Sequence, residues 1–485
     1  MSKTLKEKTA HGIIWSFFDK FGQQGLNLIV GIILMRYFLS PSEYGLLSMI
    51  LIINTLGNIF VDSGFNNALI RKQDVTQTDL SSVFYFNMSI SFLFYLLAFF
   101  SAPLFSLYFG QPVLTKLARV MALSIPIYAL SLIQTAMLAK TLNFKRLASV
   151  NLIAFFCSGF LSLFLAWKGW GVWVLIMQPL SLQFVRNICL WSFNTWRPGL
   201  IYSMQSIKNL WGYSSKLMLS AFITVIFNNI YAFFIGKIHT VSQLGYYTQA
   251  NKYSELSYIT IMSAIQTVVF PTMANIGEHD TEALKRTMRK TVRVSSFVLF
   301  PIMLGLIAVA EPLIHTLIGI KWLPIVPYIQ ILCMGYIFLG LAAPYNNILL
   351  VKGLSATYLK FNILYRAFIL LSILLTMYKG IIVMIIAWSI VSILYSLLLM
   401  LYAGKKIYYT LFEQIKDILP YFILALVMGS GVFFLSFFIE NFVLLFFTQL
   451  ITGAVFYLSA TYLLGSKVFR EVIEMIKNKL ETGRK

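Results

Sequence analysis

Residues 39–87, LSPSEYGLLSMILIINTLGNIFVDSGFNNALIRKQDVTQTDLSSVFYFN, set the pattern that the rest of the chain follows. They form a short polar turn, a long apolar segment, a basic turn and a second apolar segment. Each apolar segment is long enough to cross a bilayer as a helix, which takes about 20 residues. The stretch therefore predicts a pair of membrane-spanning helices joined by a charged turn.

The polar turn that opens this stretch has an echo later in the chain. Residues 40–48 (SPSEYGLLS) align with residues 240–248 (TVSQLGYYT), and each copy stands between two long hydrophobic segments. A shorter echo pairs Lys168-Gly169 with Lys379-Gly380. Two related halves around a central site are a common plan of membrane transporters. We therefore expect a duplicated membrane unit.

The composition is that of a polytopic membrane protein. Of 485 residues, 59% are hydrophobic and 11% are charged, whereas globular domains are about 25% charged. This length accommodates roughly fourteen crossings with short turns and leaves no room for a soluble domain of ordinary size. It excludes chemistry that needs a water-soluble catalytic module.

Apolar runs between polar breaks predict an all-α protein with about fourteen spans. The predicted spans are 11–37, 44–69, 80–107, 114–138, 145–167, 170–194, 210–236, 244–274, 288–310, 324–350, 357–377, 380–403, 414–438 and 442–464. The predicted domains are a six-helix lobe at 1–194, an inter-lobe turn at 195–209, a second six-helix lobe at 210–405, two additional helices at 406–465 and an amphipathic tail at 466–485.

Lys and Arg are concentrated in alternate turns, which places both termini in the cytoplasm under the positive-inside rule. We expect the tail to lie as an interfacial helix on an anionic leaflet. The net charge of +21 does not indicate nucleic acid, because the cations form no groove-sized patch with interleaved exposed aromatics.

The chain lacks the motifs of a catalytic or metal site. It has no G-x-x-x-x-G-K-[ST] loop, no H-E-x-x-H and no Cys/His array at ligand spacing. Its three cysteines lie inside apolar segments, where cysteine is usually a small core residue. The outward turns are short and poor in the carboxylates that a membrane transferase needs. We therefore expect no enzyme, no catalytic residue, no metal site and no cofactor.

Ionisable side chains inside the predicted spans are the remaining candidates for a site, because each costs several kcal/mol unless it faces a partner or a watery cavity. The cations outnumber the acids, and both halves contribute to them. An inward surplus of cations calls for an anionic substrate, and guanidinium and ammonium groups suit phosphate oxygens. The candidate substrate-binding residues are Arg119, Arg186, Lys216, Lys252 and Arg366.

Two acids inside the spans, Asp19 and Glu255, are candidate sites for a coupling proton or cation. Glu255 follows Lys252 by three residues, so a local ion pair is the alternative. Lys20 beside Asp19 can reach the membrane surface instead. Amides in the spans can bind sugar hydroxyls or join neighbouring helices.

Several short stretches carry a family resemblance that covers nearly the whole chain and thins after about residue 405. They are 38–45 (FLSPSEYG), 61–65 (VDSGF), 78–84 (TDLSSVF), 142–145 (LNFK), 269–271 (VFP), 300–303 (FPIM) and 310–313 (AEPL). Together they resemble the polysaccharide transport family of the multidrug/oligosaccharidyl-lipid/polysaccharide exporter superfamily. The similarity is greatest to colanic acid, teichuronic acid and O-antigen flippases. One departure is Ser257-Tyr258, where the family often has a proline.

The resemblance implies two six-helix lobes plus two extra helices that open alternately to each side of a bacterial inner membrane. Its implied cargo is an undecaprenyl-diphosphate-linked oligosaccharide. Membrane lipids are expected partners, and a polysaccharide polymerase and glycosyltransferases are candidate partners; nucleic acid is not one. A multidrug or cation antiporter and a non-transporting scaffold of the glycan assembly machinery remain alternatives.

Overall fold

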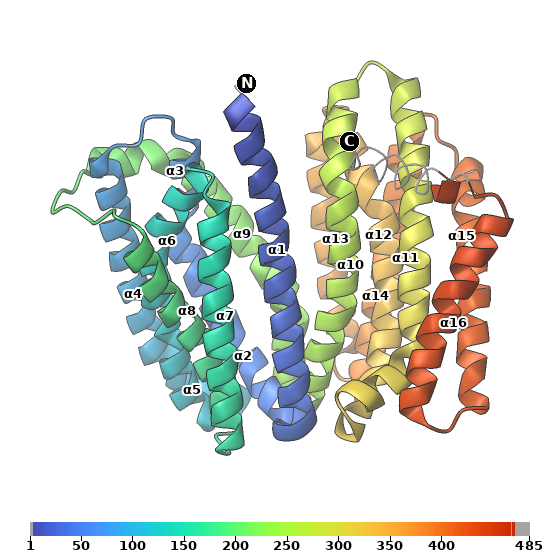
Figure 1. Ribbon diagram of the computed structural model, residues 1–485, viewed down its shortest axis with the longest axis horizontal. Helices are drawn as coiled ribbons and strands as arrows, with labels where there is room; N and C mark the ends of the chain where they lie inside the picture. The colour runs from blue at the N-terminus through green and yellow to red at the C-terminus, as the bar shows by residue number, and fades with distance from the viewer. Residues whose placement is uncertain (1–2, 467, 471–485) are drawn as a thin grey trace. The chain divides into compact units, whose positions relative to one another are not determined.

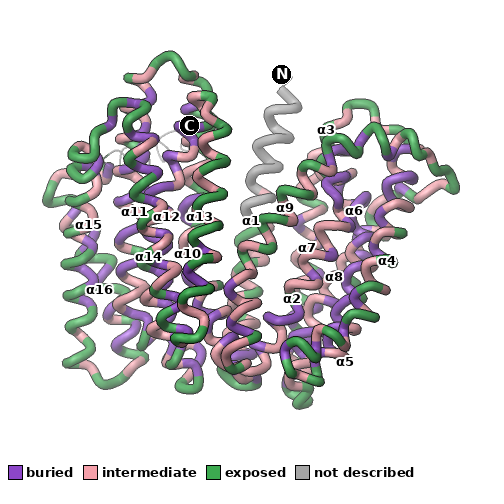
Figure 2. Tube along the Cα trace, turned by 180° about the vertical axis from the view of Figure 1, so that it is seen from behind, coloured by how far each residue is buried: buried purple, intermediate pink, exposed green. Residues whose placement is uncertain are grey.

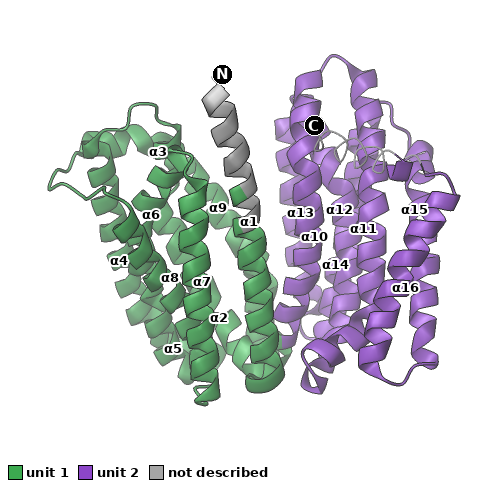
Figure 3. Ribbon diagram, in the orientation of Figure 1, with its two compact units in different colours: residues 1–245 green, residues 246–485 purple. Residues whose placement is uncertain are grey.

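The computed structural model describes residues 3–466 and 468–470, and in this part of the chain all regular structure is helical (Figure 1). The chain divides into two compact units, Met1–Gly245 and Tyr246–Lys485 (Figure 3). Each unit is a bundle of long helices joined by short turns. The all-α fold predicted from the sequence is confirmed.

The first unit contains nine α-helices and the start of a tenth. Their bounds are α1 Lys3–Ile33, α2 Pro41–Asp62, α3 Phe65–Arg71, α4 Gln77–Phe109, α5 Val113–Ala122, α6 Ser124–Lys140, α7 Phe144–Trp167, α8 Trp173–Phe193 and α9 Met204–Ile238. A π-helical segment, Leu34–Phe38, continues α1. Helix α9 packs against α2, α3 and α4.

The second unit contains the remaining α-helices. Their bounds are α10 Val241–Ile276, α11 Thr281–Leu317, α12 Val326–Val351, α13 Ser355–Thr376, α14 Ile381–Lys405, α15 Leu411–Phe434 and α16 Phe442–Leu463. A 3-10 turn at Ile320–Ile325 leads into α12, and another at Leu435–Phe437 follows α15. Helices α15 and α16 pack on α11, whereas α13 packs on α12 and α14. Helix α10 runs unbroken through Ser257-Tyr258.

Twelve helical segments of the described residues are long and apolar enough to cross a membrane. Helices α1 and α8 fall outside this set, and with them the total is the predicted fourteen. Polar side chains lower the hydropathy of these two helices. Helix α1 carries Asp19 and Lys20, and α8 carries Gln178, Gln183 and Arg186. The two least apolar spans are therefore natural places to look for a polar site.

The echoing turns at 40–48 and 240–248 are capped in the same way. Ser40 donates its backbone N–H to Glu43 Oε2 at 2.7 Å at the start of α2. Thr240 donates its backbone N–H to Gln243 Oε1 at 3.2 Å at the start of α10. Both are capping boxes, in which a residue in the first turn closes back onto the residue before the helix. The sequence echo therefore marks two equivalent helix starts.

The same two turns also touch through their glycines. A Cβ on Gly45 would lie 2.0 Å from the carbonyl oxygen of Val241, and a Cβ on Gly245 would lie 1.8 Å from that of Pro41. Pro41 and Val241 are the first residues of α2 and α10. Each glycine therefore approaches the first helical residue of the other turn. Only a residue without a side chain allows so close a backbone approach.

Burial follows the pattern expected of helices that pack on one side and meet lipid on the other. In Figure 2 buried and exposed positions alternate along most helices of each unit. Phe65 and Val83 are fully buried in the first unit, as are Trp322 and Tyr345 in the second. Large apolar side chains such as Phe160 are exposed, which suits a surface in contact with hydrocarbon. The protein is a multi-pass membrane protein.

The predicted domain boundaries at residues 194, 209, 405 and 465 follow the sequence repeat. The two compact units divide the chain at another place, after Gly245, and the predicted boundaries stay a prediction. Most of the predicted amphipathic tail at 466–485 lies outside the described residues. Its first described residues pack on the second unit, since the ring of Phe469 lies 6.4 Å from that of Phe297.

Candidate functional site

Arg186 lies on α8 close to two side-chain hydrogen bonds that join α8 to α6. Asn187 donates from Nδ2 to the carbonyl oxygen of Ile127 at 2.6 Å. One turn further on, Trp191 donates from Nε1 to the carbonyl oxygen of Leu130 at 3.1 Å. Two side chains that bond backbone carbonyls of the neighbouring helix hold the register of the pair, and they fix the position of Arg186 in the first unit.

The guanidinium of Arg186 contacts only a neutral oxygen among the described residues. Its Nη2 donates to Thr135 Oγ1 at 3.3 Å, and that hydroxyl uses its own proton on the carbonyl oxygen of Ser131 at 2.8 Å. Arg186 Nε is shielded from solvent and has no hydrogen-bond partner in the described part of the chain. Buried polar groups are usually paired, so this cation has unused capacity to bind an acceptor.

Asp19 on α1 is a carboxylate whose charge acts on this arginine. Its carboxylate accepts from Gln23 Nε2 at 2.5 Å and from Asn151 Nδ2 at 3.0 Å. Asp19 and Tyr128 both act electrostatically on Arg186. We name this group of side chains the unit-1 polar cluster: Asp19, Gln23, Tyr128, Thr135, Asn151 and Arg186.

Nearby amides in the first unit also have unsatisfied atoms. Asn58 donates to Asn54 Oδ1 at 3.0 Å, and Asn54 donates to Ser124 Oγ at 2.6 Å. The outer oxygens, Asn58 Oδ1 and Gln183 Oε1, have no partner among residues 3–466 and 468–470. Such atoms in a native interior call for water or a polar ligand. These amide oxygens are therefore available to water or to a polar ligand.

Lys252 and Glu255 on α10 form no ion pair with each other in the described structure. Glu255 Oε2 instead accepts from Asn251 Nδ2 at 3.1 Å, and Asn251 Oδ1 accepts from the hydroxyl of Tyr336 on α12 at 2.9 Å. The side chain of Lys252 is exposed. The alternative of a self-neutralising pair is therefore not realised, and both charges remain candidates for a ligand.

Aromatic rings surround this part of the second unit. Tyr336 stacks on Tyr258 with ring centroids 5.3 Å apart, and Trp388 lies 5.0 Å from Tyr336. Tyr365 and Tyr395 form a further pair at 4.5 Å. Tyrosine and tryptophan combine an apolar face with a polar edge, which is also the character of a sugar ring. These side chains could not be singled out in a sequence with so many aromatics.

The other three predicted cations lie apart from the unit-1 polar cluster or have no contact described with it. Arg119 donates from Nε to the carbonyl oxygen of Phe99 at 3.2 Å, and its guanidinium lies 4.3 Å from the Phe99 ring. Lys216 is exposed on α9, and Arg366 is half-buried on α13. The structure thus places Arg186 and Asp19 in one polar cluster of the first unit, whereas Lys252 and Glu255 share a helix of the second unit without forming an ion pair in the described structure.

A second group of buried charges, centred on Asp417 of α15, was missed by the sequence reasoning. Asp417 Oδ2 accepts from Arg289 Nε at 2.8 Å and from the Tyr409 hydroxyl at 2.9 Å, and Oδ1 accepts from Arg293 Nη2 at 2.6 Å. Burial raises the pKa of Tyr409, so its phenol keeps the proton that it donates. We name these four residues the Asp417 network. The spacing of four between the two arginines on α11 was the available signal.

Two further acids, Asp79 and Asp62, make local contacts in helix turns. Asp79 Oδ2 accepts from the backbone N–H of Thr76 at 3.0 Å and pairs with Lys72 Nζ at 2.5 Å. Asp62 Oδ1 accepts from the backbone N–H of Asn66 at 3.4 Å. Their contacts are local, as expected of capping and turn residues.

Comparison with known proteins gives consistent matches. A family described as polysaccharide biosynthesis protein matches residues 33–327. The succinoglycan biosynthesis transport protein ExoT of Rhizobium meliloti (strain 1021) is 28% identical over 69% of this chain and 68% of its own length. The lipopolysaccharide biosynthesis protein WzxC of Escherichia coli (strain K12) is 24% identical over 74% of this chain and 73% of its own length.

A solved structure has the same fold. The lipid II flippase MurJ, in an inward closed conformation, superimposes with a TM-score of 0.75 over 95% of this chain and 100% of MurJ. The identity is 19%, so this likeness speaks to the fold alone.

Proposed function

Because the chain belongs to the polysaccharide biosynthesis protein family, we propose that it moves a lipid-linked oligosaccharide across a bacterial inner membrane by alternating access. The cargo is an undecaprenyl-diphosphate-linked repeat unit of O-antigen or of an exopolysaccharide. Both termini lie in the cytoplasm, where the repeat unit is taken up. The similarity to ExoT, a succinoglycan biosynthesis transport protein, supports this class of cargo.

The physical task explains why a protein is needed. Burying a diphosphate and several sugars in hydrocarbon costs several kcal/mol for each unpaired polar group. A hydrated, cationic interior removes most of that cost, while the prenyl tail can remain in lipid. The protein therefore has no bond to break, and its work is to shelter a charged headgroup during the crossing.

The observation that carries the proposal is Arg186. It is a guanidinium inside a helix bundle whose described contact is a neutral hydroxyl, with Nε left without a hydrogen-bond partner among the described residues. A fork of parallel N–H groups suits two phosphate oxygens at once. We assign Arg186 the diphosphate, with Arg119, Lys216, Lys252 and Arg366 guiding it.

The sugars have their own candidate contacts. The amides of the first unit offer unsatisfied oxygens to hydroxyl donors. The rings of Tyr258, Tyr336 and Trp388 in the second unit offer faces for the CH sides of sugar rings. This division suits a cargo with a charged end and a longer neutral end.

Asp19 and Glu255 are the proposed coupling sites. Each carboxylate accepts hydrogen bonds from neutral amides rather than from a cation. A carboxylate held in this way can take up a proton or a small cation without first breaking an ion pair. Uptake at Asp19 would also strengthen the unit-1 polar cluster's preference for an anion, since it removes the charge that competes for Arg186.

Reconstitution tests the proposal. The purified protein is placed in liposomes, and a fluorescent undecaprenyl-diphosphate oligosaccharide is followed from one leaflet to the other by a membrane-impermeant quencher. We expect protein-dependent movement that a neutral fluorescent lipid does not show. Movement of organic cations in place of the glycan lipid would establish an antiporter, and a folded protein that moves neither would establish a scaffold.

A further inference from the structure

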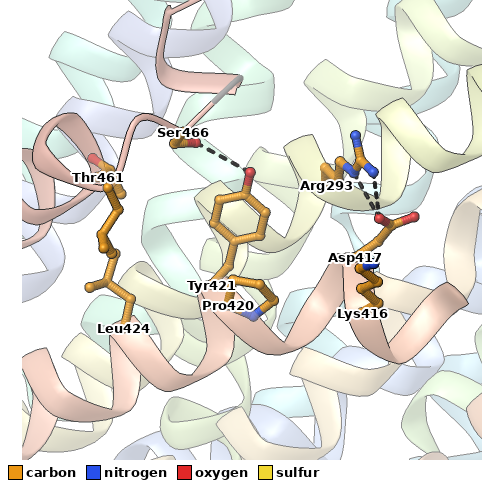
Figure 4. Close-up of a pocket in the computed structure, with 9 residues that line it drawn as sticks. Arg293, Lys416, Asp417, Pro420, Tyr421, Leu424, Thr461 and Ser466 are labelled. Atoms are coloured by element: carbon orange, nitrogen blue, oxygen red, sulfur yellow. Dashed lines mark hydrogen bonds and ion pairs between the residues drawn. The ribbon is translucent and has the colours of Figure 1, made fainter. Parts of the chain in front are cut away.

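A pocket of about 270 Å³ opens in the second unit between α11, α15 and the end of α16 (Figure 4). It lies on the side of the unit formed by these three helices, whereas α13 packs on α12 and α14. Neither Lys252 nor Glu255 lines it. It is therefore separate from the part of the second unit assigned to the glycan.

One wall of the pocket is cationic. Arg293 and Lys416 line it, together with Asp417. The carboxylate of Asp417 is already engaged by both arginines and Tyr409. Lys416 is exposed and has no ion pair with a described residue. Lys416 is thus the cation of this wall that no described carboxylate engages.

Arg293 adds donor capacity beside this lysine. Its bonds to Asp417 Oδ1 use Nε at 2.9 Å and Nη2 at 2.6 Å. Within the described chain Nη1 makes no hydrogen bond, and Figure 4 shows one guanidinium nitrogen turned away from Asp417. Arg289 and Lys285 lie behind this wall, where Lys285 pairs with Glu413 at 2.8 Å. Four cations against two carboxylates leave a local positive surplus.

The rest of the pocket is amphiphilic. Tyr421 and Ser466 face it with hydroxyls 3.2 Å apart, and Pro420 and Leu424 supply an apolar floor. On the same helix, Leu419 and Ile423 are exposed with relative areas of 44% and 49%. A ligand at this position would meet two cationic side chains, two hydroxyl groups and a hydrocarbon surface.

We propose that this pocket binds the headgroup of an anionic phospholipid, with its phosphodiester between Lys416 and Arg293 and its acyl chains along α15. A phosphodiester carries one negative charge, and Lys416 is the lining cation that no described carboxylate engages. Basic residues near a membrane surface attract anionic lipid with about 1 kcal/mol each. The hydroxyls of Tyr421 and Ser466 would bond the polar part of the headgroup.

The test is native mass spectrometry of the full-length protein in detergent with added phosphatidylglycerol, phosphatidylethanolamine or undecaprenyl diphosphate. We expect phosphatidylglycerol to be retained in preference to phosphatidylethanolamine. Lys416→Gln should weaken phosphatidylglycerol retention about fivefold. Leu424→Trp, which fills the floor and leaves all charges in place, should weaken it as well.

The matched control is Lys405→Gln, which removes the same charge from the exposed end of α14, outside the pocket. It should leave retention unchanged. Equal losses for Lys405→Gln and Lys416→Gln would overturn the proposal, because the effect would then come from general surface charge. Equal retention of both phospholipids, or retention in which Lys416 matters only for undecaprenyl diphosphate, would overturn it too.

Discussion

Arg186 in the first unit and Arg293 in the second are both guanidiniums inside helix bundles, yet their surroundings differ. Arg293 shares Asp417 with Arg289 and Tyr409, at distances of 2.6 to 2.9 Å. Among the described residues, Arg186 reaches only the hydroxyl of Thr135, at 3.3 Å. Arg293 is therefore paired with a carboxylate, whereas Arg186 has no carboxylate partner among the described residues.

The difference teaches how to separate a structural charge from a functional one. In a buried ion pair, the attraction between the partners offsets the desolvation of each charge. Removing one partner leaves an uncompensated buried charge and strongly destabilises the protein. A cation without a carboxylate partner can still bind an anionic ligand. Substitutions at the two arginines and their partners distinguish these two classes.

The largest effect is expected at Asp417. Asp417→Ala leaves Arg289 and Arg293 facing each other without their shared acceptor, and we expect it to destabilise the protein by about 3–5 kcal/mol. Thermal unfolding in detergent, followed by tryptophan fluorescence, measures this loss. Glu440→Ala, which removes an exposed acid from the turn before α16, is the control. Equal melting temperatures for the two variants would contradict a structural role for the network.

Arg186→Gln should give the reverse result. The melting temperature should stay within about a degree or two of wild type, because no described carboxylate is left unpaired by the change. Transfer of the lipid-linked oligosaccharide between leaflets should fall tenfold or more, since a hydrogen bond to a charged group contributes about 1.5–3 kcal/mol.

Arg146→Gln is the control for that variant. Arg146 lies at the start of α7 and donates to the carbonyl oxygen of Phe193 at 2.9 Å, away from the unit-1 polar cluster. It should transport normally. A transport loss in Arg146→Gln as large as in Arg186→Gln would show that position inside the unit does not matter.

Glu255→Gln extends the comparison to the second unit and should have a moderate effect. The amide keeps the size of the side chain and can still bond Asn251, so stability should change little. If Glu255 takes up the coupling ion, the stimulation of transport by an imposed proton or sodium gradient should disappear while a slow basal rate remains. Glu278→Gln, on an exposed turn, should keep the stimulation.

The smallest effect is expected at Thr135. Thr135→Val removes the one described acceptor of Arg186 Nη2 and should change the transport rate only severalfold, as a net hydrogen bond contributes about 1 kcal/mol. The same substitution in an Arg186→Gln background should have no further effect. Additive losses in this double-mutant cycle would mean that Thr135 acts independently of the arginine.

The fold could be predicted from the sequence because helical spans depend on local composition. The echo at residues 40–48 and 240–248 was visible for the same reason, since capping and close approach each require a particular residue type at one position. The contact between Gly45 and Gly245 was not visible. It depends on how two distant helix starts meet in space.

The candidate site was only partly predictable. The ionisable residues could be found because charges are rare in spans, but their partners could not, because partners come from other helices. Arg119 was predicted in the same class as Arg186, and its contacts with the ring and carbonyl of Phe99 were not visible in the sequence. Arg293 and Asp417 pair across more than a hundred residues, so only the packing of α15 on α11 shows that their charges offset each other.

Binding of undecaprenyl diphosphate to the purified protein tests the central claim most directly. Affinities of wild type and Arg186→Gln would be measured in the same detergent, with Arg146→Gln beside them. We predict that Arg186→Gln binds about tenfold more weakly and that Arg146→Gln binds as wild type does. Equal affinities for all three proteins would contradict the claim that the open guanidinium of the first unit receives the diphosphate.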